Sequence, residues 1–72
     1  MPKPAPDPKL AARLRSYMLA RAEHEANPDD DTLAARRAAA RPLRRMLGNR
    51  GFRQTRYLLQ VHGMALVAQF EA

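Results

Sequence analysis

The 72-residue chain is almost without β-branched side chains, and this feature constrains its fold most. It contains no isoleucine, and its only β-branched residues are Thr32, Thr55, Val61 and Val67. Alanine and arginine, the two most common residues, and leucine, the next most common, all favour helices. Composition therefore predicts an all-α fold: a small three-helix domain with a kinked or broken second helix and a proline-rich N-terminal arm.

The domain organisation follows from the prolines. Proline occupies every second position from Pro2 to Pro8, which is typical of an extended or disordered segment. We therefore assign residues 1–8 to a flexible proline-rich arm and residues 9–72 to a single helical domain. The chain has 14 alanines and only 19 larger apolar residues. Because so thin a core gives marginal stability, an oligomer or a partner is expected to add to it.

The first helix is bounded by local signals. Asp7 is a suitable N-cap with Pro8 at the first helical position, and Asn27-Pro28 is expected to end the helix. Arg21 and Glu25 are four residues apart, which predicts an ion pair. Helical spacing then predicts a core-facing stripe made of Leu10, Ala11, Leu14, Tyr17, Met18 and Ala22.

The second helix is expected to follow directly, with Asn27 or Asp31 as its N-cap. The aspartates 29–31 then lie at its positive dipole end, which fits them better than a metal site would. Pro42 removes a helical hydrogen bond, so we expect a kink there or a division into 28–40 and 42–47. Gly48 suits the left-handed residue of a turn that ends this helix.

The third helix is predicted from about Phe52 to Phe70 and is apolar nearly all round. Such a helix is usually buried on more than one side, and the surface left uncovered would serve self-association or a partner. Gly63 is interpreted as a point of close helix approach. The candidate residues for this protein interface, or for a homo-oligomer, are Leu59, Met64, Leu66, Val67 and Phe70.

Eight arginines fall between Arg36 and Arg56, a stretch of 21 residues that contains no acid and no lysine. The formal net charge is +6, so an anionic partner is indicated. Arg36 projects nearer the apolar side, where its stem could pack. The others divide into a row on the second helix and a collar at the start of the third, joined by the glycine turn. They are the candidate nucleic-acid or anion-binding residues: Arg37, Arg41, Arg44, Arg45, Arg50, Arg53 and Arg56.

Catalysis is not expected. Cysteine is absent, Ser16 is the sole serine, and the only histidines, His24 and His62, lie on different helices. His62 is interpreted as a core or interface residue. We expect no metal and no cofactor, and the apolar stretch 57–70 is too short and too polar to span a bilayer. Without a signal-like segment at its start, the chain is expected to be cytoplasmic.

The leading hypothesis is a small basic non-enzymatic module that contacts DNA, RNA or a ribonucleoprotein surface, mostly through the nucleic-acid backbone. The rival is a protein-binding adaptor or inhibitor, of the kind that a phage or mobile element encodes, which docks through the apolar third helix plus arginines. A helix-turn-helix fits poorly because the arginines are split between two helices. A basic membrane-surface role and a merely solvated basic face are the remaining alternatives.

Overall fold

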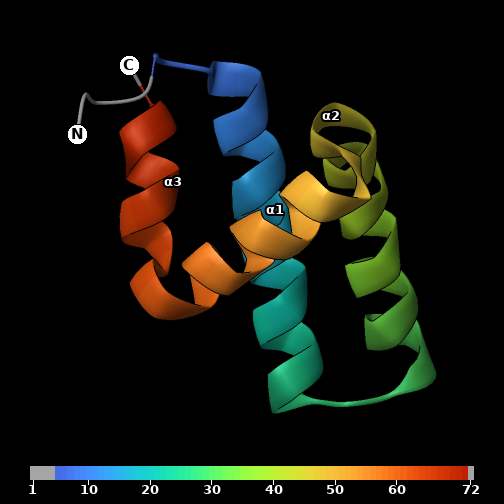
Figure 1. Ribbon diagram of the computed structural model, residues 1–72. Helices are drawn as coiled ribbons and strands as arrows, with labels where there is room; N and C mark the ends of the chain where they lie inside the picture. Colours follow the sequence, from blue (N-terminus) through green and yellow to red (C-terminus); the bar gives the residue numbers. More distant parts are fainter. Residues whose placement is uncertain (1–4, 72) are drawn as a thin grey trace.

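The computed structural model describes residues 5–71, which form three helices and no strand (Figure 1). They are α1 (Pro8–Ala26), α2 (Asp30–His62) and α3 (Met64–Phe70). The predicted all-α class is confirmed. Within α2 the backbone is non-helical at Gly48, where the helix changes direction. We refer to residues 30–47 and 49–62 as the first and second segments of α2.

α1 begins and ends where the sequence predicts. The Asp7 carboxylate accepts a hydrogen bond from the backbone N–H of Leu10 at 3.1 Å, Pro8 opens the helix, and Asn27 is its C-cap. The Asp7 backbone N–H donates to the carbonyl of Phe70 at 2.8 Å, which ties the start of α1 to the end of α3. Asp7 and Pro8, which the predicted division assigns to the arm, thus cap and open the first helix. Residues 1–4 of the predicted arm, and residue 72, lie outside the described residues.

The N-cap of α2 is Asp29, so the expectation of Asn27 or Asp31 is wrong. The Asp29 carboxylate accepts from the backbone N–H of Thr32 at 2.8 Å, and the Asp29 N–H donates to the Thr32 hydroxyl at 3.1 Å. The N–H of Thr32 thereby lowers the pKa of the Asp29 carboxyl below its ordinary value. Of the three adjacent aspartates, only Asp29 has a partner three residues later that completes this reciprocal pair.

The predicted break at Pro42 is also wrong. The first segment continues through Pro42 with helical dihedral angles, and Gly48, with φ 75° and ψ 168°, is where helical geometry is lost. Gly48 thus takes the positive φ that the sequence indicates. Pro42 lies between the buried residues Ala40 and Leu43, and burial of this face offsets the cost of the lost hydrogen bond.

The single third helix predicted over 52–70 is interrupted. Gly63, with φ 60°, ends α2 and leaves α3 with seven residues. A Cβ atom at Gly63 would meet nothing within 4 Å, so this glycine supplies a positive φ and not a close helix approach.

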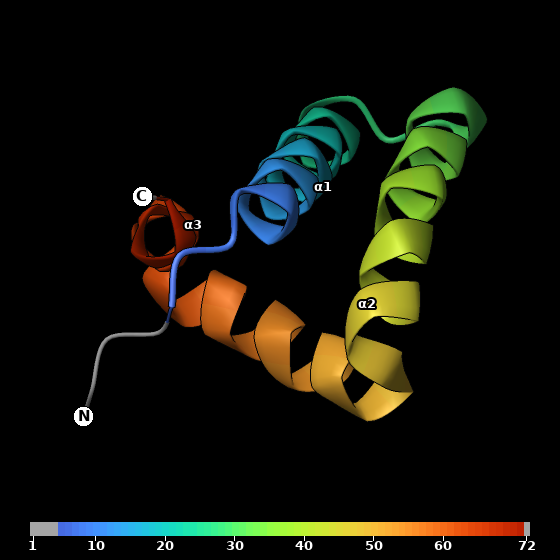
Figure 2. The ribbon, with the colours of Figure 1, turned by 90° about the horizontal axis from the view of Figure 1, so that it is seen from above.

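The core draws on all three helices. In Figure 2 the two segments of α2 meet at an angle, with α1 and α3 on the inner side of that angle. The core thus occupies the inner side of the angle at Gly48, and the inward faces of both α2 segments pack against it. Its larger members are Leu10, Leu14, Tyr17, Leu43, Phe52, Leu59, Leu66 and Val67.

Candidate anion-binding site

Two stripes of side chains meet at the Gly48 turn. On the first segment of α2, Arg37 and Arg44 are seven residues apart and flank the buried Ala40. On the second segment, Arg56 lies four residues after the buried Phe52 and so on the same side of the helix, and Arg53 is the next residue in the chain. Each stripe therefore places arginines beside a core residue, at the edge of the face that packs inward. The change of direction at Gly48 brings the two edges together.

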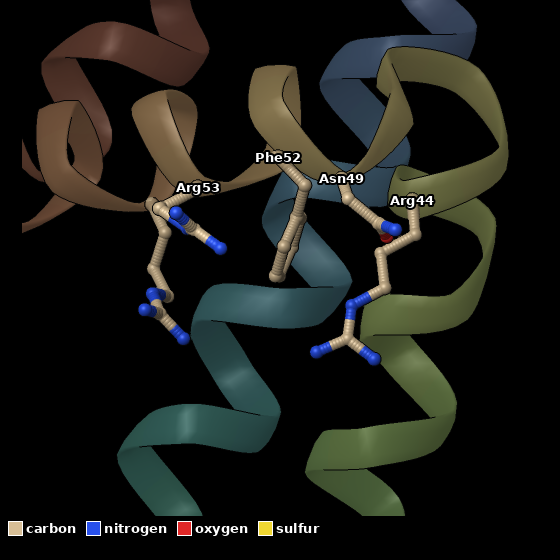
Figure 3. Close-up of a pocket in the computed structure, with 5 residues that line it drawn as sticks. Arg44, Asn49, Phe52 and Arg53 are labelled. Atoms are coloured by element: carbon tan, nitrogen blue, oxygen red, sulfur yellow. The ribbon is translucent and has the colours of Figure 1, made fainter.

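The first hollow, of about 240 Å³, lies where these edges meet. Figure 3 shows the Phe52 ring between the side chains of Arg44 and Arg53, which come from different segments and extend toward the same side. Phe52 forms the floor, and the remaining wall is polar. The lining residues are Arg44, Asn49, Phe52, Arg53 and Arg56.

Aromatic contacts hold the floor of this hollow in place. The Arg44 guanidinium carbon lies 5.2 Å from the centre of the Phe52 ring, a cation–π contact. Phe52 in turn meets Tyr17 of α1 edge to face, with ring centres 5.6 Å apart and planes at 79°. Both aromatic residues are buried. The position of Arg44 is therefore coupled to the core through Phe52.

A second hollow, of about 200 Å³, shares Arg44, Phe52 and Arg56 with the first and so adjoins it. Its floor contains Tyr17, Leu33 and Ala40, which present carbon atoms, and further arginines stand at its edge. These additional arginines are Arg36 and Arg37. We refer to the two hollows together as the arginine site.

Among residues 5–71, no acidic side chain forms an ion pair with the arginine site. Within residues 5–71 the two ion pairs are Arg15 with Glu71 and Arg21 with Glu25, the second at 3.1 Å as its spacing predicts. None of the eight arginines from position 36 to 56 forms an ion pair within residues 5–71. Their charges repel one another across the hollows, and an anion placed there would relieve that repulsion.

The structure brings together only part of the predicted anion-binding set. Arg37, Arg44, Arg53 and Arg56 line the arginine site, as does Arg36, which sequence reasoning set aside. The signal for Arg36 was its spacing from Leu33 and Ala40, which puts it on the inward stripe. The other predicted residues are exposed but line neither hollow: Arg41, Arg45 and Arg50.

The residues predicted for a protein interface are mostly in the core. Leu59, Leu66 and Val67 are buried, so these three candidate side chains are not at the surface of this fold. Phe70 is half-buried and Met64 is 44% exposed. The interruption at Gly63 turns α3 onto the core and hides most of this apolar set.

A different apolar surface lies between α1 and the start of α3. It is a hollow of about 480 Å³ lined by Arg15, Met18, Leu19, Ala22 and Met64, and we call it the apolar hollow. Leu19 is 63% exposed there and was not identified from the sequence. Leu19 lies outside the core-facing stripe of α1 and next to Met18, and this position in the sequence could have indicated its exposure.

The two histidines do not form a reactive pair. Nδ1 of His24 lies 2.9 Å from the Thr32 hydroxyl oxygen, which links the end of α1 to the start of α2. His62 is exposed at the end of α2, so it is not a core residue. Residues 5–71 contain no group of three or more histidine, cysteine, aspartate or glutamate side chains placed to hold a metal ion.

No helix within the described part of the chain combines the length and apolar character that crossing a membrane requires. Comparison with known proteins found no matching family model, no similar curated protein and no similar solved structure.

Proposed function

We propose that the chain is a small basic non-enzymatic module that binds nucleic acid, or a ribonucleoprotein surface, through phosphate contacts at the arginine site. One observation carries the proposal. Arg44, Arg53 and Arg56 converge from two helical segments on one hollow, with no acid paired to them within residues 5–71. Guanidinium groups bind phosphate oxygens through paired hydrogen bonds, so converging arginines are suited to a phosphodiester.

The geometry favours backbone contacts over base readout in a groove. A groove-reading helix must project from the protein, whereas these arginines surround hollows on the inner side of the Gly48 turn. Affinity would then come mainly from the release of counterions from phosphates and would fall steeply as salt is added.

The test is binding of fluorescently labelled DNA and RNA oligonucleotides, measured by anisotropy over a salt series. The logarithm of the association constant should fall linearly with the logarithm of salt concentration. Arg44→Gln should lower the affinity and reduce the slope by roughly one phosphate contact, about 0.7 to 0.9.

Arg45→Gln is the matched control, because Arg45 is the exposed neighbour of Arg44 on the same segment and lines neither hollow. It removes the same charge and should have the smaller effect. Failure of the wild-type protein to bind single or double strands at low salt would overturn the proposal.

The apolar hollow supports a second candidate function, that of a protein-binding adaptor or inhibitor. Leu19 and Met64 expose large apolar side chains beside Met18, and such contiguous surface is typical of a docking site. Here a nuclease-resistant complex should be lost with Leu19→Asp and retained with Arg44→Gln. A complex that survives Leu19→Asp would exclude the apolar hollow as the docking site.

A further inference from the structure

The two hollows of the arginine site adjoin but differ in chemistry. Arginines and Asn49 surround the first, with the Phe52 ring as the only apolar member of its lining. The second has carbon-rich side chains on its floor, from Tyr17, Leu33 and Ala40, with arginine side chains at its edge. A ligand that fills both hollows would carry an anionic group next to one that can contact carbon atoms and guanidinium groups together.

A nucleotide whose base is unstacked has this combination. Its phosphate would occupy the first hollow among Arg44, Arg53 and Arg56. One face of its base would lie on Leu33 and Ala40 in the second hollow, and a planar guanidinium group of the edge could stack on the other face. Because the two hollows share Arg44, Phe52 and Arg56, the phosphate and the base would lie next to each other, as they do in one nucleotide.

A duplex does not supply this ligand. Its bases are stacked and paired inside the helix, so its surface offers phosphates and sugars along the backbone. The first hollow could accept a duplex phosphate, but the apolar floor of the second would remain without a partner. We propose that the arginine site is specific for single-stranded nucleic acid, taking one phosphate in the first hollow and its unstacked base in the second.

This inference rests on the proposed function and adds strand selectivity to it. Any readout of the base would come from the arginines at the edge of the second hollow and not from the aliphatic part of its floor. The floor of the second hollow comes from Leu33, Ala40 and the edge of the buried Tyr17, and aliphatic side chains offer a base contact but no hydrogen bonds. Asn49, which could read a base edge, lines only the first hollow, on the phosphate side.

The experiment compares three oligonucleotides with equal numbers of phosphates on the binding strand, at one salt concentration. They are an intact single strand, the same strand with abasic tetrahydrofuran sites, and a duplex. Contact with aliphatic side chains and guanidinium planes should let the intact strand bind the wild-type protein about 2-fold to 5-fold more tightly than the abasic strand. It should also bind more tightly than the duplex.

Leu33→Gln provides the internal check. Leu33 is half-buried and lines only the second hollow, so this variant should lose affinity for the intact strand and keep its affinity for the abasic strand. Loss of affinity for both strands would indicate that the variant is unfolded. The affinities of the wild-type protein for the three oligonucleotides would then decide whether the site is selective for single strands.

Equal or tighter binding of the abasic strand or of the duplex would overturn strand selectivity and leave phosphate binding intact. Absence of binding to all three ligands would instead overturn the proposed function itself.

Discussion

Gly48→Ala should destabilise the fold and open the arginine site. The φ of 75° and ψ of 168° at Gly48 belong to a region that is essentially restricted to glycine, and holding another residue there costs about 1–3 kcal/mol. A Cβ atom at Gly48 would meet nothing within 4 Å, so no clash adds to this cost. Alanine also restricts the unfolded chain, which offsets about 0.4–1 kcal/mol. At the mid-values of these two ranges the net loss is about 1.3 kcal/mol.

Thermal unfolding followed by circular dichroism at 222 nm measures this loss. For a domain of this size, 1 kcal/mol corresponds to about 4–8 °C, so the melting temperature should fall by about 5–10 °C. If alanine instead straightened α2, Phe52 and Leu59 would leave the core, which would lower stability further and separate Arg44 from Arg53. Affinity for an oligonucleotide should therefore fall together with stability.

Two controls isolate the backbone effect. Chemical synthesis of the chain with D-alanine at position 48 supplies a Cβ atom together with a preference for positive φ, and its stability should equal or exceed that of the wild type. Gly51→Ala alters a glycine with helical geometry, so any loss of stability there would come from the added Cβ, 3.1 Å from that of Leu47, and not from backbone strain. A Gly48→Ala protein that melts at the wild-type temperature would refute the reasoning, as would a D-alanine protein equally destabilised.

Three further predictions concern the core, the helix cap and the anion site. Leu43→Ala removes a fully buried side chain and should lower the free energy of unfolding by about 2–5 kcal/mol in urea titration. Asp29→Ala removes the N-cap of α2 and should lower the melting temperature more than Asp30→Ala. Because the N–H of Thr32 lowers the pKa of Asp29, its contribution is fully present above the ordinary value of 3.8 and is lost as pH falls through the lowered pKa, so the two variants should converge in acid. Inorganic phosphate should raise the melting temperature more than sodium chloride of equal ionic strength, by about 1.4 kcal/mol of stability at ten times its Kd, and Arg53→Gln should reduce that difference.

The helix boundaries that sequence predicts correctly depend on near neighbours. Asp7-Pro8 and Asn27-Pro28 set the limits of α1 because capping and proline sterics act within a few residues. The errors arise where tertiary packing decides. At Pro42 the burial of adjacent residues keeps the helix continuous, and at Gly63 the apolar residues on both sides concealed a change of direction.

The arginine site shows the same limit. Helical spacing divides the arginines into a row on the first segment and a collar on the second, but the members that converge depend on the angle at Gly48. That angle follows from how Phe52 packs on Tyr17, which involves residues 35 positions apart. Sequence therefore grouped Arg41, Arg45 and Arg50 with the others and left out Arg36. Leu59, Leu66 and Val67 were assigned to a surface because the turn of α3 onto the core was not foreseen.

The central claim is that the placement of the arginines, and not their number, creates the binding site. The most direct measurement compares two triple variants by anisotropy with a single-stranded oligonucleotide. One replaces Arg44, Arg53 and Arg56, which line the first hollow, with glutamine. The other makes the same replacement at three exposed arginines that line neither hollow: Arg41, Arg45 and Arg50.

Both variants lose the same formal charge, and glutamine preserves helix propensity in both. A diffuse basic surface would make them equally weak. The structure predicts that the first variant loses nearly all affinity and most of the salt dependence, while the second retains most of both. Equal losses in the two variants, or a larger loss in the second, would contradict the account.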